Sequence, residues 1–475
     1  MTHYQPPRHE LLAPRRLAKT LYLPPGPGLV DVLLAYARDP LGFFVRCSHR
    51  YGDVVRLVRP NMPHRPGYLL NHPDHIEYVL VKNNRNFVRD QDSRKLLDLL
   101  GNGLLTSEGE FWRRQRRFVQ PAFHRARLDT YRAVMESCAQ DLISEWQDGE
   151  IRDVLQDMTR LTLRIVAKTL FSADMADDTN KVGKAIEMVM DRSSEQGSTL
   201  FARFILGRIP TPGTLRYHAA IRRLNEVIAS IIAKHRGDDG GEERDDLLSM
   251  LIHAKDDQGN RMSDQQLHDE VLTVIMAGHE TTAVCLSWTW HLLATHPEVE
   301  TKLLTELRDV LAGRAPLVAD LPQLRYTAAV LKESMRLYPP GWVLGREAVE
   351  GCKIGGYDVP AGTQLYMSQW VAHRDPRYFE KPDAFIPERW TDEFEAQLPK
   401  YAYFPFSGGP RVCPGKSFAI METAIVLATI VQRFQLRTAP GEHVAPLPSI
   451  TLRPKGGLRM ILTAREALRH EDEVA

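Results

Sequence analysis

The stretch from residue 263 to residue 296 constrains this chain most, because it reads as a single unbroken helix. Ser263 and Gln266 have the spacing of a capping box at its start, and the dipeptide His296-Pro297 marks its end. At about 1.5 Å per residue such a helix spans roughly 45 to 50 Å, the width of a whole protein of this size. Its largely apolar composition suits burial, so the sequence predicts a helical protein built around it.

The remaining segments predict a mainly α fold with small β-sheets at its edge. Apolar residues recur at helical spacing over residues 33–51, 111–232, 298–311 and 325–337, with a break at Pro210 and Pro212. Residues 54–57 and 68–70 look like short strands, as do segments between 343 and 369. We expect a flexible N-terminal segment over residues 1–22, one domain over residues 23–465 and a solvated charged tail over residues 466–475.

Charge and cysteine content argue against several classes of protein. The chain has 61 Lys and Arg against 60 Asp and Glu, which gives no electrostatic reason to expect a nucleic-acid partner. Its five cysteines are scattered and lack a C-x-x-C pair, which argues against zinc and favours a reducing compartment. The apolar run over residues 29–37 is too short to cross a bilayer. We therefore expect a cytoplasmic protein without a transmembrane anchor.

Cys413 differs from the other four cysteines in its surroundings. It lies in the sequence F-S-G-G-P-R-V-C-P-G, residues 406–415, directly before a strongly apolar helical stretch. The N-terminus of a helix favours a thiolate, the form that binds metal, because its dipole and unpaired N–H groups attract negative charge. Glycines in this loop let the backbone approach a flat ligand closely. The other cysteines are better explained as small buried hydrophobic residues.

This cysteine loop resembles the F-x-x-G-x-R-x-C-x-G signature of the cytochrome P-450 family. Its fixed positions are occupied by Phe406, Gly409, Arg411, Cys413 and Gly415. The resemblance implies the cytochrome P-450 fold, with haem b between the long helix and the helix that follows the cysteine loop. It also implies that Cys413 is the axial ligand of the iron and that Phe406 and Arg411 contact the haem.

A polar interruption, A-G-H-E-T-T at residues 277–282, lies midway along the long helix. Ala277 and Gly278 are small enough for a flat cofactor to lie against the helix. The Thr281 hydroxyl can bond to the carbonyl of Ala277 one turn earlier, and Glu280 can serve as a proton source. Alone, such a run is more often a satisfied structural cluster. Its similarity to the family's A-G-x-E/D-T-T pattern implies that Glu280 and Thr281 deliver protons during oxygen activation.

Glu333 and Arg336 lie one helical turn apart, and such pairs are usually surface features worth a few tenths of a kcal/mol. Together with Arg389 in the sequence F-I-P-E-R-W, they resemble the family's E-x-x-R and P-E-R-F motifs. Trp390 takes the place of the phenylalanine and keeps an aromatic ring. The resemblance implies a structural role for the three charged residues, which lock the segment before the cysteine loop.

Trp112 and Arg116 resemble the family's W-x-x-x-R motif. The alternative is a helix packed by Trp112 and solvated by its arginines. Haem carries two propionates that need cationic or N–H donors. With the resemblance, the expected donors are Trp112, Arg116, Arg346 and Arg411. Arg113 and Arg117 on the adjacent face either extend a positive surface for an acidic electron donor or form a generic basic helix face.

The resemblance implies that one oxygen atom of O2 enters a lipophilic small molecule and the other leaves as water. The chain has no G-x-G-x-x-G unit in a strand-helix setting, so the electrons are expected from a ferredoxin or flavodoxin with its NAD(P)H reductase. The implied substrate pocket has small or apolar side chains, those of Ala277, Gly341, Val343, Leu344 and Ile450. It suits a fatty acid, a terpenoid or a polyketide, and the sequence does not choose among them.

Two other functions stay open at this point. A peroxide-driven haem-thiolate peroxygenase or isomerase would keep the cysteine loop, although the pair Glu280 and Thr281 argues against it. A non-catalytic haem sensor is the alternative from another class, and no appended output domain is seen in the sequence. Replacement of Thr281 by alanine distinguishes the first alternative, because a peroxide-driven enzyme does not depend on that hydroxyl.

Overall fold

The computed structural model describes residues 21–36, 38–58, 66–94, 96–124, 127–172, 188, 212–237 and 246–465. The expected N-terminal segment up to residue 20, the expected tail over residues 466–475 and the expected helix break at Pro210 lie outside these residues. Tyr22, at the end of the segment expected to be flexible, is docked. Its ring stacks on Tyr357 with centroids 5.0 Å apart, and its backbone N–H donates to Asp358 at 2.8 Å.

Helices make up most of the described residues, which confirms the predicted mainly α fold with small sheets. The α-helices are α1 (Leu29–Asp31), α2 (Pro40–Tyr51), α3 (Pro73–Glu77), α4 (Gln91–Arg94), α5 (Leu97–Leu100), α6 (Gly109–Val119), α7 (Leu128–Ser144), α8 (Val154–Phe171), α11 (Pro212–Gly237), α12 (Leu247–His253), α13 (Asp264–Thr295), α14 (Pro297–Leu311), α15 (Arg325–Leu337), α16 (Gln369–Ala372), α17 (Asp392–Gln397) and α18 (Lys416–Val431). Short 3-10 and π turns connect several of them.

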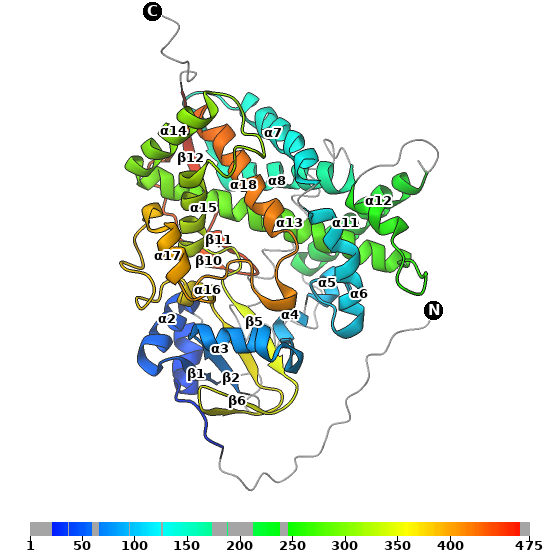
Figure 1. Ribbon diagram of the computed structural model, residues 1–475, viewed down its shortest axis with the longest axis vertical. Coiled ribbons are helices and arrows are strands. Elements are labelled where there is room, and N and C mark those ends of the chain that lie inside the picture. The colour runs from blue at the N-terminus through cyan, green and yellow to red at the C-terminus, as the bar shows by residue number, and fades with distance from the viewer. Residues whose placement is uncertain are drawn as a thin grey trace, which may run out of the picture.

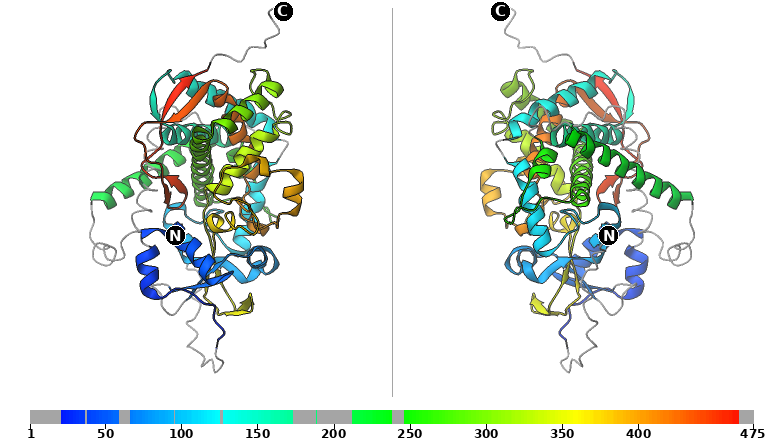
Figure 2. Two further views of the ribbon diagram at one scale, coloured as in Figure 1. Left: turned by 90° about the vertical axis from the view of Figure 1, so that its left-hand side faces the viewer. Right: turned by 90° about the vertical axis from the view of Figure 1, so that its right-hand side faces the viewer.

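Within the described residues, four small sheets accompany the helices. The five-stranded sheet has the order β1-β2-β8-β5-β3, with β1 (Val54–Leu57), β2 (Gly67–Leu70), β8 (Gln364–Met367), β5 (Leu344–Ala348) and β3 (Phe87–Arg89). A three-stranded sheet consists of β4 (Ile151–Asp153), β12 (Arg459–Ala464) and β9 (Phe434–Thr438). Two hairpins pair β6 (Cys352–Ile354) with β7 (Tyr357–Val359), and β10 (Pro446–Pro448) with β11 (Leu452–Pro454). The five-stranded sheet lies at one end of the molecule, below the main group of helices (Figures 1 and 2).

The long helix α13 is the central element of the core. Its capping box is present, because the Ser263 hydroxyl accepts from the Gln266 N–H while the Gln266 side chain accepts from the Ser263 N–H. It packs against α8, α15, α18 and β11 in the middle of the helical part (Figure 1). Among the described residues it is the one helix long and apolar enough to cross a membrane, but 83% of that apolar window is buried within the protein. This burial is that of a core helix.

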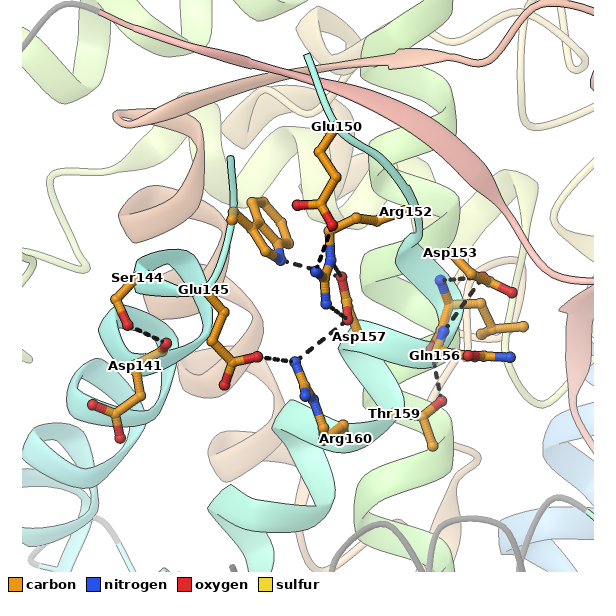
Figure 3. Close-up of polar contacts among 12 residues, drawn as sticks. Asp141, Ser144, Glu145, Glu150, Arg152, Asp153, Gln156, Asp157, Thr159 and Arg160 are labelled. Atoms are coloured by element: carbon orange, nitrogen blue, oxygen red, sulfur yellow. Dashed lines mark hydrogen bonds and ion pairs between the residues drawn. The ribbon is translucent and has the colours of Figure 1, made fainter. Parts of the chain in front are cut away.

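A polar network anchors the start of α8, the helix that packs along α13 (Figure 3). The Asp157 carboxylate accepts from Arg152 Nε at 2.6 Å, from Arg152 Nη2 at 2.9 Å and from the Trp146 indole at 3.1 Å. Arg160 lies beside it and pairs with Glu145 at 2.7 Å. Because the carboxylate of Asp157 is buried, these donors compensate for its lost hydration and fix β4 against α8.

The residues of the E-x-x-R motif form a buried network and not a surface pair. The Glu333 carboxylate accepts from Arg336, from Arg389 Nε at 2.9 Å and from the backbone N–H of Ile386 at 3.0 Å. The guanidinium of Arg336 also donates to three backbone carbonyls of the following segment, those of His373, Pro382 and Ala384. The indole of Trp390 donates to Glu333 at 2.9 Å, a hydrogen bond that phenylalanine cannot make. The network thus ties α15 to the chain that leads into the cysteine loop.

Candidate active site

The middle of α13 has a short exposed face, although most of this helix is buried in the core. Ala277 is exposed and Gly278 and Thr281 are half-buried, whereas the residues before and after them on the helix are buried. The Thr281 hydroxyl donates to the carbonyl of Ala277 at 2.8 Å, which confirms the hydrogen bond predicted from their spacing. A side chain at Gly278 would meet Val166 of α8 at 3.2 Å. This glycine therefore has a packing reason, and its contact with a cofactor stays a prediction.

Glu280 is buried next to this face and is paired with residues far away in the sequence. Its Oε1 accepts from Arg453 Nη2 at 2.9 Å and from the Thr451 hydroxyl at 2.9 Å, while its Oε2 has no hydrogen-bond partner among the described residues. Both donors come from β11 or the residue before it. Sequence reasoning missed Thr451 and Arg453, because nothing in the local pattern of β11 indicates which side chain it faces.

The cysteine loop is held in a tight turn before α18. The N–H of Cys413 donates to the carbonyl of Phe406 at 3.1 Å, and Arg116 donates to the carbonyl of Val412 at 2.8 Å. Gly409 has a φ of +65°, and a side chain there would lie 1.9 Å from the carbonyl oxygen of Leu80. Only glycine satisfies both conditions, which explains its place in the motif.

The thiol of Cys413 is exposed on this loop, although the protein around it restricts hydration of a thiolate. The restricted hydration raises the pKa of the Cys413 thiol. The backbone N–H of Gly415 and the cations of Arg116 and Lys416 act in the opposite direction. The sequence predicted that the helix N-terminus would favour the thiolate. The N–H of Gly415, the N-cap residue of α18, acts in the predicted direction, although desolvation has the larger effect on the pKa of the thiol.

Beside the cysteine loop lies a cluster of arginines, of which Arg346 is buried and Arg89 and Arg411 are half-buried. Arg411 pairs with Glu108, donates to the carbonyl of Ser107 at 3.1 Å and stacks over the ring of Trp112 at 4.3 Å. Arg346 on β5 stands directly opposite Arg89 on β3 in the antiparallel register. The sequence analysis identified Arg116, Arg346 and Arg411 but missed Arg89, whose position follows from this register alone.

The arginine cluster holds more positive charge than its surroundings compensate. Burial, together with the mutual repulsion of the guanidinium groups, lowers the pKa of Arg89 to about 9 and those of Arg346 and Arg411 to about 10. The Nε of Arg89 has no hydrogen-bond partner among the described residues. Such a cluster favours an anionic ligand, because added negative charge relieves both the desolvation and the repulsion.

The three features fit a haem. The exposed face of α13 offers small side chains to a flat ring, the Cys413 thiol offers an iron ligand, and the arginine cluster offers donors to two carboxylates. The described residues contain no group of three or more His, Cys, Asp or Glu side chains able to hold a bare metal ion.

The segments that carry the expected substrate contacts are joined to one another. The N–H of Leu452 donates to the carbonyl of Pro340 at 2.9 Å, and the Trp342 indole donates to the carbonyl of Ser449 at 2.9 Å. Gly341, Val343 and Leu344 on one segment are half-buried, and Ile450 on the other is 36% exposed. These two segments and the exposed Ala277 border the same region of α13, where Thr451 reaches Glu280.

The basic face of α6 is partly neutralised. Arg113 pairs with Glu110, and Arg117 Nη1 lies 2.8 Å from the Asp257 carboxylate. Both arginines are more than half exposed. Exposed pairs of this kind contribute little to stability and open easily, so a surface for an acidic electron donor stays a prediction.

Comparisons with known proteins agree with this geometry. The sequence profile described as "Cytochrome P450" matches residues 23–459. Cyclooctatin synthase from Streptomyces melanosporofaciens is 38% identical over 440 residues, covering 92% of this chain and 94% of the relative. Pentalenene oxygenase from Streptomyces avermitilis is 34% identical over 447 residues, covering 92% and 97%. The crystal structure of the cytochrome P450DA heme domain superposes with a TM-score of 0.83 at 27% identity, covering 95% of this chain and all of that one.

Proposed function

Since this chain belongs to the cytochrome P450 family and is a haem-thiolate monooxygenase, we propose that its substrate is a terpenoid and that a separate redox protein supplies its electrons. The observation that carries the assignment is the exposed Cys413 on a tight loop before α18, beside the arginine cluster. When bound, the haem supplies the oxygen chemistry, by which one atom of O2 enters the substrate.

Cys413 is the proposed ligand of the iron of haem b. Arg116, Arg346 and Arg411, with Trp112, are the proposed donors to the haem propionates, and Arg89 joins them because it faces Arg346 across the strand pair. Phe406, Ala277 and Gly278 are the proposed apolar contacts of the ring. Ionisation of the propionates beside the arginines supplies the negative charge that the cluster lacks.

The substrate class rests on two relatives and on the character of the pocket. Relatives are named cyclooctat-9-en-7-ol 5-monooxygenase and pentalenene oxygenase, at 37% and 34% identity. The pocket residues Gly341, Val343, Leu344 and Ile450 carry no charged group, and the pocket thus selects an apolar skeleton over a carboxylate such as a fatty acid. We expect cyclic terpene hydrocarbons and their alcohols to shift the haem absorption spectrum in titrations and to yield hydroxylated products. Fatty acids of similar carbon number serve as the control, and a spectral response to the fatty acids alone refutes the assignment.

Glu280 and Thr281 are the proposed proton-delivering pair. The Thr281 hydroxyl is fixed by its bond to Ala277 at the exposed face of α13, where it can hold a water molecule beside the reacting centre. Thr281→Ala removes this hydroxyl. We expect electron consumption to continue while product formation falls by about 10²-fold, the usual contribution of a positioned proton donor, with peroxide released instead.

The matched control is Thr282→Ala on the next position of the same helix, whose hydroxyl bonds to the carbonyl of Gly278 at 3.0 Å. Product, peroxide and NAD(P)H consumption are measured together. Unchanged product formation in Thr281→Ala would favour the peroxide-driven alternative, because that reaction receives both oxygen and protons with the peroxide.

The proposed electron donor is a ferredoxin or flavodoxin with its NAD(P)H reductase, docking on the arginine-bearing face of α6. Residues 23–465 are proposed to form one catalytic domain, and the family profile spans residues 23–459 of it. We also propose a cytoplasmic location, because the five scattered cysteines suit a reducing compartment.

A further inference from the structure

The carboxylate of Glu280 is held from one side only. Oε1 takes both hydrogen bonds, from Arg453 and from Thr451, and Oε2 takes none among the described residues. Glu280 is 1% exposed and Arg453 is 8% exposed, so this is a buried ion pair with one oxygen left unpartnered. An unpartnered carboxylate oxygen in a buried position is costly, and its persistence beside the reaction centre points to a functional role.

The position of Arg453 is fixed by backbone contacts and not by the ion pair alone. Arg453 pairs with Leu447 across the β10–β11 hairpin. The preceding residue, Leu452, accepts from the Trp288 indole of α13 at 2.7 Å and donates to Pro340 at 2.9 Å. The guanidinium therefore reaches Glu280 from a strand that is docked on α13 independently of the pair.

The charged and titratable groups at Glu280 are Arg453 on β11 and His279, its neighbour on α13. His279 Nδ1 lies 2.6 Å from the carbonyl of Ile275, and burial lowers the pKa of the His279 ring, which keeps it neutral. Arg453 is thus the counter-charge of Glu280. Without a counter-charge, a buried carboxyl group holds its proton and cannot pass it on.

We propose that Arg453 is a positioning residue for proton delivery: with Thr451 it holds Oε1 of Glu280, so that Oε2 can take up a proton and release it again. The inference rests on the proposed role of Glu280. One proton enters Oε2 from the solvent side and leaves toward the water at Thr281, and the carboxylate that remains is stabilised by Arg453. No electron is transferred in this step. The same hairpin carries Ile450, so a substrate contact and the proton supply share one structural element.

The test compares Arg453→Gln, Arg453→Lys and Thr451→Val in the haem-loaded enzyme. We expect Arg453→Gln to lower the ratio of product to O2 consumed by about tenfold, because Glu280 is then trapped as the protonated acid. Arg453→Lys keeps the positive charge and should recover most of the coupling. Thr451→Val keeps the ion pair and should show a smaller loss.

A spectroscopic readout separates positioning from a general structural effect. Infrared spectra of Arg453→Gln at neutral pH should show an added protonated-carboxyl band that is missing from the double variant Arg453→Gln/Glu280→Gln. The matched control is Arg465→Gln, which removes another partly buried arginine. Arg465 lies 2.7 Å from Glu300 of α14, and among the described residues it has no bond to Glu280. It should change neither the carboxyl band nor the coupling. If Arg453→Gln does not fold, the ordering of Arg453→Lys, Thr451→Val and the unaltered enzyme decides the matter.

The failure of this inference can be told apart from that of the proposed function. Uncoupling in Glu280→Gln, with full coupling and no new band in Arg453→Gln, overturns the role of Arg453 and leaves the role of Glu280 intact. Full coupling in Glu280→Gln overturns the proton-donor assignment itself, and the role of Arg453 with it. Non-additive losses of coupling in the double variant support both the role of Glu280 and that of Arg453, because Arg453 then acts through Glu280.

Discussion

Replacing Cys413 with serine is expected to abolish the thiolate-type spectrum of the carbon monoxide complex and to reduce product formation to the background rate. The reason is that Cys413 alone is exposed among the five cysteines, all of which lie in the described residues, and it stands on the loop directly before α18. A serine hydroxyl stays protonated at neutral pH and is a poor ligand of iron. It cannot supply the electron donation that a thiolate gives for cleavage of the O–O bond.

The control for this prediction is Cys352→Ser, which alters a half-buried cysteine on β6. Its spectrum and turnover should match those of the unaltered enzyme. Measurement of haem content in both variants shows whether Cys413→Ser loses the cofactor or keeps it with a different ligand. A thiolate-type spectrum that persists in Cys413→Ser would falsify the assignment of the ligand, and with it the central claim about this site.

Glu333→Gln is expected to have the largest effect on stability of any single change in the E-x-x-R network, lowering the free energy of unfolding by about 3 to 5 kcal/mol. The carboxylate of Glu333 is fully buried and accepts from Arg336, Arg389, Trp390 and the backbone of Ile386. The glutamine has the same shape but no charge, and its NH2 group faces N–H donors. Arg336, itself fully buried, is left without a counter-charge.

Two variants calibrate this result. Trp390→Phe removes one hydrogen bond to Glu333 and keeps both ion pairs, so it should cost only about 1 to 2 kcal/mol. Lys332→Gln, on the same helix as Glu333, breaks an exposed ion pair with Glu395 of α17. This change should cost less than about 1 kcal/mol. Urea midpoints of the three variants are compared. Equal midpoints for Glu333→Gln and Lys332→Gln would contradict the structural role of the network.

The local elements were largely predictable from the sequence. The start of α13 follows from the capping box, and the bounds of α15 from apolar spacing and from the prolines after it. The bond from Thr281 to Ala277 follows from a spacing of four residues on a helix. Each of these depends on neighbours within about one helical turn, and the sequence states those neighbours directly.

The partners across the fold were not predictable in the same way. Arg89 joins the arginine cluster only because β3 pairs with β5 in one particular register, and a shift of one residue would turn it to the other face. Arg453 reaches Glu280 only because the β10–β11 hairpin docks on Trp288. Likewise, the gain of a hydrogen bond by Trp390 depends on its distance from Glu333 and not on its aromatic character.

The division has a physical cause. The sequence by itself determined the helices and the position of the cysteine loop, because propensity, capping and periodicity act between residues close along the chain. The tertiary structure decided which charged groups lie close together. It therefore decided which buried carboxylate is paired with a cation and which arginines carry an uncompensated positive charge. Those energies depend on burial and on distances of a few ångströms between segments more than 150 residues apart, such as Glu280 and Arg453.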